Sequence, residues 1–503
     1  MNVGYLLTNT AAKFPQKEGI VCDQSRMTFV QFEGRVARLS GAMLKSGLKR
    51  GDRVALLFYN GSQFVETYFA AIRIGLVATS VNFRFLGNEI IHILNDSGAT
   101  ALFHGSEFVS VVEAVRDRCP ALRLVVCPNG GSRTLDYEEF LSEGRPCKVD
   151  PTVTESDQCQ LMYTSGTTGR PKGVELNHGN VLWNLINTIL GREDRPGQVS
   201  VIVGPLYHAA ALNNHFTTQV ALGGKSVLVS NFDPVVLLSI IEREKVTVIS
   251  GAPAFYRLLM EVPGAWDFDR SSITKCTVGA DKLSQNTKSK LLEFFPNISG
   301  VYDVYGCTEA TACITILTAE QSSRKHGSSG RSLPFLQARV VDDFDHPLEA
   351  GQVGELVCKG PNVMQGYHNQ PEVSAEAIKE GWLYTGDLAW MDEEGFFYIV
   401  GRKKDMIVSG GENIYPREIE NLLLAQPMIA DVAVVGESDD LWGESVTAVV
   451  VLKKGAILSD KEVIDYCKDH LASYKKPRKV IFTNELPRNA SGKVMKGQLR
   501  TAS

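Results

Sequence analysis

The chain has 503 residues, which is more than one ordinary hydrophobic core accommodates, so two or more domains are expected. Hydrophobic residues make up 44% and charged residues 22%, as in ordinary globular proteins, and the formal net charge is -5. This acidic balance argues against a nucleic-acid-binding protein, because such proteins normally carry a basic surplus on at least one domain. Any cations that hold an anionic ligand must therefore be concentrated locally.

The N-terminal part alternates predicted helices and strands. Residues 28–31 fit a capping box, followed by apolar Phe32, Val36, Leu39 and Met43 at helical spacing, with Gly47 as the expected end. Further along, the pattern predicts a buried strand at 54–59, a helix at 64–74, strands at 226–230, 246–250 and 301–305, and helices at 234–244 and 283–295. This alternation is typical of α/β layers.

The pattern changes after residue 336. Short β segments with Gly351, Gly354, Gly360, Gly366 and Gly395 as turn markers predict a small β subdomain up to Tyr398. A last segment predicts helices at 416–425 and 462–471 and strands at 431–435, 445–452 and 479–483. We therefore expect an α/β protein with a large N-terminal domain (1–402), built of two α/β sheet subdomains plus the β subdomain, and a small α+β domain (403–503).

Ten cysteines are present, and none forms a Cys-x-x-Cys pair. The nearest two, Cys307 and Cys313, have five residues between them, so zinc ribbons and redox dithiols are not indicated. Scattered reduced thiols are typical of a cytoplasmic protein. The sequence shows neither a signal-peptide pattern at Met1 nor an apolar stretch long enough for a membrane helix, so we expect a cytoplasmic protein without a membrane span.

A phosphate-binding loop is predicted at 163–173, which reads Tyr-Thr-Ser-Gly-Thr-Thr-Gly-Arg-Pro-Lys-Gly. It follows a predicted strand at 160–163. Glycines let the backbone wrap phosphate oxygens, hydroxyls and amides donate to them, and a lysine adds charge. A Walker loop would need a hydroxyl residue after the lysine, whereas Gly173 follows Lys172, so the loop is of another kind. The alternative, a flexible turn, would explain a shorter segment rich in Gly, Ser and Thr. It does not explain the two cations, Arg170 and Lys172, at the end of this one.

This segment resembles the signature loop of the adenylate-forming superfamily, which includes acyl-CoA synthetases, adenylation domains of peptide synthetases and beetle luciferases. The resemblance covers nearly the whole chain, because the other family motifs follow in the expected order. It implies that a carboxylic acid reacts with ATP to give acyl-AMP, and that the acyl group then passes to coenzyme A, with Mg²⁺ on the ATP. It assigns the phosphates to Thr164, Ser165, Gly166, Thr167, Thr168, Gly169 and Lys172.

Two further segments are assigned to the nucleotide. The sequence Tyr305-Gly306-Cys307-Thr308-Glu309 follows a predicted strand and is similar to the family's Tyr-Gly-x-Thr-Glu motif. A carboxylate there suits Mg²⁺, which prefers oxygen ligands. Without the other motifs, the segment would be interpreted as a turn with an exposed glutamate. The resemblance assigns Mg²⁺ to Glu309 and the α-phosphate to Thr308. It places Gly279, Ala280 and Asp281 beside the adenine and adds Tyr305 to the nucleotide contacts.

The C-terminal motifs are assigned to the ribose, the hinge and the two half-reactions. Asp387 and Arg402 match the family's ribose contacts. Lys404 matches the hinge about which the C-terminal domain rotates, and Gly410 and Gly411 lie in the segment that then lets the pantetheine arm pass. Lys493 matches the adenylation lysine. The Pro-x4-Gly-Lys spelling at 487–493 resembles an acetylation context, so a lysine acetyltransferase is a candidate partner.

The acyl site is assigned from Pro205-Leu206-Tyr207-His208, which is similar to the family's Pro-Leu-Phe/Tyr-His motif. The resemblance makes His208 a pocket wall and gate, with any acid–base role left open. By family position the pocket is lined by Trp183, His208, Ala209, Ala210, Gly279, Tyr305, Thr311 and Ala312. None would pair a second carboxylate or an amine, so we expect a medium-chain aliphatic, alicyclic or aromatic acid.

Three alternatives remain open from the sequence. A stand-alone adenylation enzyme that loads a carrier protein, or a luciferase-like oxygenase, would share the adenylation motifs. A catalytically silent nucleotide-binding scaffold would be expected to lack Lys493 or Glu309, and both are present. The sequence does not specify the oligomeric state; a homodimer is one candidate.

Overall fold

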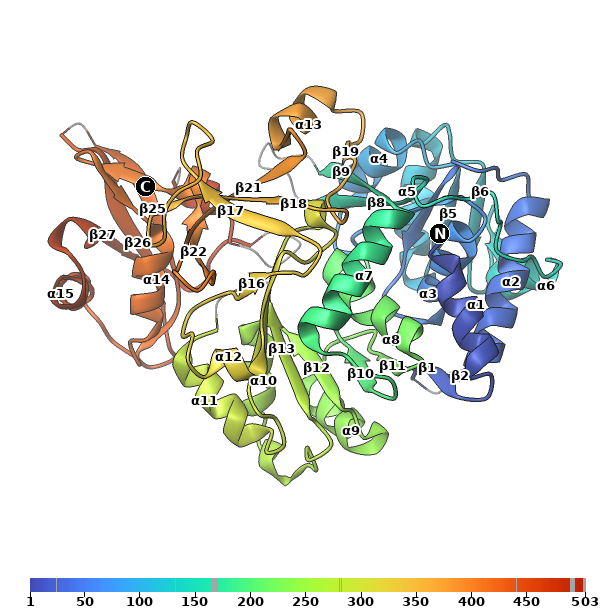
Figure 1. Ribbon diagram of the computed structural model, residues 1–503, viewed down its shortest axis with the longest axis horizontal. Coiled ribbons are helices and arrows are strands. Elements are labelled where there is room, and N and C mark those ends of the chain that lie inside the picture. The colour runs from blue at the N-terminus through green and yellow to red at the C-terminus, as the bar shows by residue number, and fades with distance from the viewer. Residues whose placement is uncertain are drawn as a thin grey trace. The chain divides into compact units, whose positions relative to one another are not determined.

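The computed structural model describes residues 1–23, 25–131, 133–164, 171–279, 281, 283–439, 441–488 and 494–500 (Figure 1). The chain divides into two compact units, Met1–Ala338 with Cys358–Tyr384, and Arg339–Val357 with Thr385–Ser503. The chain therefore passes from one unit to the other three times. The α/β class predicted from the alternating pattern is confirmed, while the boundary at 402 stays a prediction.

The first unit contains an eight-stranded sheet. Its strands lie in the order β19-β9-β8-β4-β3-β5-β6-β7, with bounds Gly366–Tyr367, Lys172–Asn177, Gln158–Thr164, Val77–Ser80, Arg53–Leu57, Ala101–His104, Leu124–Cys127 and Leu135–Asp136. Neighbours from β8 to β7 are parallel, whereas β9 runs antiparallel to β8 and β19 runs antiparallel to β9. Helix α3 (Ser62–Ile72) connects β3 to β4 and α4 (Gly87–Asp96) connects β4 to β5, while α2 (Phe29–Lys45) leads into β3 from the strand β2 (Ser25–Thr28) of the nine-stranded sheet.

The same unit contains a nine-stranded sheet. The order is β16-β15-β14-β13-β12-β10-β11-β1-β2, with bounds Arg331–Ser332, Thr315–Leu317, Val301–Tyr305, Lys275–Gly279, Val248–Gly251, Val199–Ile202, Lys225–Leu228, Glu18–Cys22 and Ser25–Thr28. The six strands from β14 to β1 are mutually parallel. Their carboxyl ends therefore share one edge, where ligands bind in open α/β sheets.

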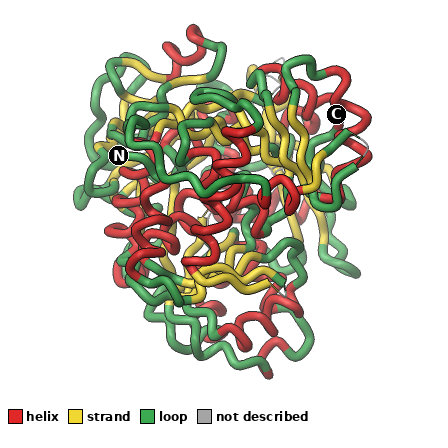
Figure 2. The backbone as a smooth tube through the Cα atoms, turned by 90° about the vertical axis from the view of Figure 1, so that its right-hand side faces the viewer, coloured by secondary structure: helices red, strands yellow, loops and turns green. Residues whose placement is uncertain are grey.

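Helix α7 (His178–Arg192) links the two sheets of this unit. It contacts β9 of the eight-stranded sheet and the π-helix η3 (Ala210–Phe216), which follows β10 of the nine-stranded sheet (Figure 1). Figure 2 shows the helices and strands of the chain after a 90° turn about the vertical axis. The helix carries Trp183 in its first half and ends at Arg192.

Local sequence signals explain several element boundaries. Thr28 caps α2 in a complete capping box with Gln31, as the sequence predicts. The Asp233 carboxylate accepts hydrogen bonds from the amides of Val235 and Val236, and Pro234 occupies the first turn of α9 (Pro234–Glu244). The helix therefore begins and ends as predicted.

The second unit contains its own five-stranded sheet. Strands β24 (Glu412–Ile414), β23 (Ile407–Ser409), β26 (Gly443–Leu452) and β25 (Ile429–Asp439) follow in that order, and β27 (Lys479–Phe482) pairs with β26. Helices α14 (Pro416–Leu424) and α15 (Asp460–His470) contribute Ile419, Leu423 and Val463 to its core. These elements match the predicted C-terminal helices and strands. The strands β23 and β24 were not predicted from the sequence.

The predicted β subdomain needs three corrections. A sheet of β17 (Gln337–Val341), β18 (Gly354–Lys359), β21 (Trp382–Met391), β20 (Ile378–Lys379) and β22 (Phe397–Arg402) is present, but the helix α13 (Pro371–Ala377) interrupts the segment. Gly351 and Gly395 have positive φ and mark turns as predicted, whereas Gly366 begins the strand β19. Gly354 instead begins β18, where a Cβ atom would lie 2.2 Å from the Val341 carbonyl oxygen, so close backbone approach explains this glycine.

All ten cysteines carry reduced thiols, and only Cys147 and Cys307 are more than marginally exposed. Burial raises the thiol pKa to about 12 at Cys276, Cys313 and Cys358. Within the described residues, every helix is too short or too polar to cross a bilayer.

Candidate active site

The flanks of the predicted phosphate loop are held by one helix. Thr164 and Lys172 are register partners on β8 and β9. On the entry side, the Tyr163 hydroxyl donates to Asp96 at 2.6 Å, and on the exit side His92 Nε2 lies 3.1 Å from the Pro171 carbonyl oxygen. Both partners belong to α4. The loop residues Ser165, Gly166, Thr167, Thr168 and Gly169 lie outside the described residues.

Tyr367 connects two predicted phosphate-site residues. Its hydroxyl donates to Glu309 Oε1 at 2.9 Å, and the Lys172 ammonium lies 5.4 Å from the centre of its ring. Strand β19 places it there through antiparallel pairing of Tyr367 with Val174 on β9. A predicted loop cation and the predicted metal carboxylate thus share one side chain. Tyr367 was not predicted from the sequence, because no local motif marks it and its partners are distant along the chain.

The carboxyl edge of the nine-stranded sheet gathers the other predicted residues of this unit. Gly279 ends β13, Tyr305 ends β14, and Thr308 and Glu309 lie in the short 3-10 helix that follows. His208 follows β10, its ring 4.3 Å from that of Tyr207. Asp281 is exposed beside this edge, and Ala280 lies outside the described residues. Parallel register, and not sequence distance, brings these positions together.

The other predicted acyl residues fall into three groups. Trp183 packs on Phe335 with ring centres 5.2 Å apart, beside a surface pocket of about 390 Å³ that residues 334–337 and 359–361 also line. Ala210 begins η3, and Ala209 lies between it and His208. Thr311 and Ala312 have positive φ, and the buried Thr311 hydroxyl donates to the Asn362 carbonyl oxygen at 2.6 Å. The Thr311 hydroxyl is therefore already bonded within the fold.

In the second unit, Asp387 and Arg402 are register partners on β21 and β22 and form an ion pair of 2.7 Å. The Asp387 residue is 6% exposed, whereas the Arg402 side chain is 42% exposed. An arginine so placed orients the carboxylate, as an acceptor for two neighbouring hydroxyls must be.

The hinge and thioester-step residues lie in the same unit. Lys404 is exposed in the 3-10 helix Lys403–Asp405. Gly410 and Gly411 form the turn between β23 and β24, with φ of +60° and +83°. A Cβ atom at Gly410 would lie 2.7 Å from the Trp442 ring, so both backbone and space require glycine there. Lys493 lies outside the described residues.

The donor set around Glu309 fits magnesium. No cluster of three or more metal-ligating side chains occurs among the described residues. Magnesium in nucleotide sites, however, is held by one or two carboxylates together with phosphates and water. Glu309 is half-buried, its Oε1 is fixed by Tyr367, and Thr308 adds a hydroxyl beside it.

Comparison with known proteins identifies the family. The AMP-binding enzyme family matches residues 7–368, and the AMP-binding enzyme C-terminal domain matches residues 418–493. The chain belongs to the AMP-binding enzyme family. The chain is 38% identical to a feruloyl-CoA synthase of Amycolatopsis sp over 476 residues, 94% of this chain and 93% of that protein. It is 36% identical to an indoleacetate–CoA ligase of Aromatoleum aromaticum over 492 residues, 98% of this chain and 94% of the relative.

Solved structures of the family extend the likeness to the fold. An anthranilate CoA ligase in complex with anthranoyl-AMP has a TM-score of 0.93 at 25% identity, covering 100% of this chain and 97% of that one. The o-succinylbenzoate CoA synthetase of Bacillus subtilis, bound to its acyl-adenylate intermediate, has a TM-score of 0.88 at 31% identity. The match covers 99% of this chain and 98% of that one. The predicted adenylate-forming architecture is confirmed.

Proposed function

We propose that this AMP-binding enzyme is an ATP-dependent acyl-CoA synthetase, an acid–thiol ligase that forms acyl-AMP and pyrophosphate and then acyl-CoA and AMP. The observation that carries the proposal is the Tyr367 bridge, because it holds Glu309 and Lys172 around one side chain. A carboxylate and a cation held in this way suit a metal-bound triphosphate.

In the first step the substrate carboxylate attacks the α-phosphate of ATP and pyrophosphate leaves. A free carboxylate is a poor acyl donor, since its leaving group would be oxide. Lys172, Thr308 and Lys493 offset the negative charge that builds on the phosphate, while Asp387 with Arg402 orients the ribose. Mg²⁺ held by Glu309 would neutralise phosphate charge.

The second step requires the adenylation lysine to leave the site and a thiol to enter. Rotation of the C-terminal domain (403–503) about Lys404 achieves this exchange, and Gly410 and Gly411 then lie along the pantetheine arm. The positive φ angles and absent side chains of this turn support a close approach of the ligand to the backbone. The thiol attacks the acyl-adenylate carbonyl and AMP leaves.

The substrate is an aryl-substituted carboxylic acid. The names of the relatives point to aromatic acids, and the Trp183–Phe335 pair lines a pocket large enough for a ring. A long-chain-fatty-acid–CoA ligase of Mycobacterium tuberculosis, 32% identical over 506 residues, supports an aliphatic acid as the second candidate.

The test is a panel of aryl and aliphatic acids assayed for pyrophosphate release and, separately, for thioester with coenzyme A. We expect both products with aryl acids, and Tyr367→Phe to lower the adenylation rate about tenfold through the loss of one hydrogen bond to a charged group. Pyrophosphate release without thioester would indicate a carrier-protein acceptor. Light emission with luciferin would indicate the oxygenase, and no release would indicate the silent scaffold.

Two further properties belong to this proposal. Acetylation of Lys493 would remove the charge needed in the first step, and mass spectrometry of protein from its native host would detect it. A homodimer would appear in light scattering as twice the chain mass.

A further inference from the structure

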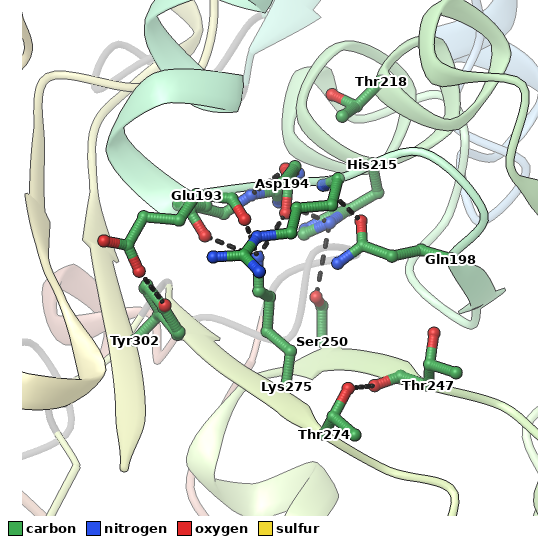
Figure 3. Close-up of polar contacts among 12 residues, drawn as sticks. Glu193, Asp194, Gln198, His215, Thr218, Thr247, Ser250, Thr274, Lys275 and Tyr302 are labelled. Atoms are coloured by element: carbon green, nitrogen blue, oxygen red, sulfur yellow. Dashed lines mark hydrogen bonds and ion pairs between the residues drawn. The ribbon is translucent and has the colours of Figure 1, made fainter. Parts of the chain in front are cut away.

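A buried charged cluster lies beside the nine-stranded sheet (Figure 3). Arg192, at the end of α7, is 1% exposed. Its guanidinium donates to Asp194 Oδ2 at 2.9 and 2.6 Å, to the Asn214 carbonyl oxygen at 2.5 Å, and to His215 Nδ1 at 2.8 Å. Lys275 donates to Asp194 Oδ1 at 2.8 Å. The charged side chains of the cluster thus form hydrogen bonds with one another, and their role is to stabilise the fold.

His215 is the member of the cluster with unused hydrogen-bonding capacity. A guanidinium only donates, so Nδ1 must accept from Arg192, and the Ser250 hydroxyl lies 3.3 Å from the same nitrogen. The proton of the neutral ring is therefore on Nε2. Burial and the neighbouring Arg192 lower the His215 pKa to about 3, so the ring stays neutral in the physiological range.

The Nε2 proton of His215 is available to a ligand. Among the described residues, no hydrogen-bond partner lies at this nitrogen, and His215 is partly exposed, whereas Arg192, Asp194 and Asn214 are buried. Arg192 and Ser250 contact the ring at Nδ1, and these contacts fix the direction of the Nε2–H bond.

The position of His215 connects it to the substrate edge. It lies in η3, the π-helix that begins two residues after His208; π-helical turns are frequent at functional sites. Ser250 is the next-to-last residue of β12, and its neighbour Gly251 pairs with Val278, directly before Gly279. The ring therefore lies at the carboxyl edge that carries the predicted acyl contacts.

We propose that His215 is a specificity residue whose Nε2 proton binds an oxygen acceptor, such as a methoxy, hydroxyl or keto oxygen, on the tail of the acid. This inference rests on the proposed function and narrows its substrate class to oxygen-substituted aryl acids. An acid without the oxygen would leave the donor without a partner, and such mismatches discriminate more strongly than a change in apolar contact.

The test compares matched pairs of benzoic and phenylpropenoic acids that carry either a methoxy or an ethyl group at the same ring position. The two groups have similar shape, but only methoxy accepts a hydrogen bond. The specificity ratio, kcat/KM for methoxy over ethyl, is measured for the wild type and for two variants. His215→Asn keeps an acceptor near Nδ1 for Arg192 and removes the distal donor. His215→Gln places an amide N–H near Nε2.

We expect the wild type to prefer the methoxy acid about tenfold in at least one pair, from one hydrogen bond. This preference should disappear in His215→Asn and persist in His215→Gln. Equal ratios in the wild type and His215→Asn, with pyrophosphate still released, would overturn the specificity role and leave the proposed function standing. Absence of pyrophosphate release with every acid would overturn both.

Discussion

The Tyr163 hydroxyl donates to the Asp96 carboxylate at 2.6 Å and thereby fixes the strand that enters the predicted phosphate loop to α4. The same helix binds the exit side through His92 and the Pro171 carbonyl oxygen. Burial, together with the Asp96 charge, raises the Tyr163 pKa, so the phenol remains a donor at all physiological pH values. The loop is thus positioned from one rigid element.

Tyr163→Phe should raise the KM for ATP about tenfold, because a hydrogen bond to a charged group is lost at the loop entrance. Tyr137→Phe is the matched control, since its hydroxyl donates to Glu66 at 2.8 Å, away from the loop. Both variants should lose stability in thermal unfolding. An unchanged KM for Tyr163→Phe would show that the contact serves stability alone.

Lys493→Ala should slow acyl-adenylate formation on the order of a hundredfold and spare thioester formation from supplied acyl-adenylate. Lys496→Ala is a nearby control, because the Lys496 ammonium is paired with Glu420 at 2.7 Å. The two half-reactions are measured as pyrophosphate release and thioester yield. Equal losses in both would count against the assignment of Lys493.

Asp387→Ala should abolish the discrimination between ATP and 2′-deoxy-ATP. An ionised carboxylate that accepts the 2′-hydroxyl favours ATP by about 10- to 100-fold, and this preference requires the carboxylate. Asp343→Ala, which removes an exposed partner of Lys403 in the same unit, should keep the wild-type ratio. A preserved ratio in Asp387→Ala would exclude the ribose contact.

The stability of the fold should fall between pH 6.5 and pH 4, partly through His178. This side chain is 0% exposed and accepts a hydrogen bond from the Val3 amide at 3.1 Å through Nδ1. Burial lowers its pKa from 6.5 to about 4. The unfolded chain therefore binds a proton at a pH where the folded chain does not, and stability is complete only above pH 6.5.

At pH 5 this difference amounts to about 2 kcal/mol. His178→Asn keeps an acceptor for Val3 and should reduce the loss of unfolding free energy between pH 8 and pH 5, as measured by urea denaturation. The loss should not vanish, because the His215 pKa is also lowered, to about 3. His346→Asn, at an exposed histidine, should leave the loss unchanged, and an equal reduction there would contradict the role of His178.

Helices and strands whose boundaries depend on neighbouring residues were predicted well from the sequence. Helix α9 has both an Asp233 cap and Pro234 at its start, and β14 is rich in valine and tyrosine, which favour strands, so both were predicted with their observed bounds. Helix α13 was missed because none of its seven residues is buried, so no apolar periodicity marks it.

The site was predictable in its motifs but not in its supporting residues. Glu309 and Lys172 stand in recognisable segments, whereas Tyr367 is 58 residues from Glu309 along the chain and lies in a two-residue strand. Lys275 and Asp194 are 81 residues apart, and each would be taken from sequence as a solvated surface charge. Each contact joins a residue on a strand to a residue outside the strands, and the tertiary fold that brings them together is not revealed by a single sequence.

The burial of most cysteines makes coenzyme A consumption directly measurable with a thiol-specific dye. Nucleophilic attack requires thiolate, so the buried thiols with raised pKa values should react slowly in the native protein. The background should come from Cys147 and Cys307. Because Cys307 directly precedes Thr308, the rate at which an alkylating reagent labels it should also report whether nucleotide occupies the neighbouring site.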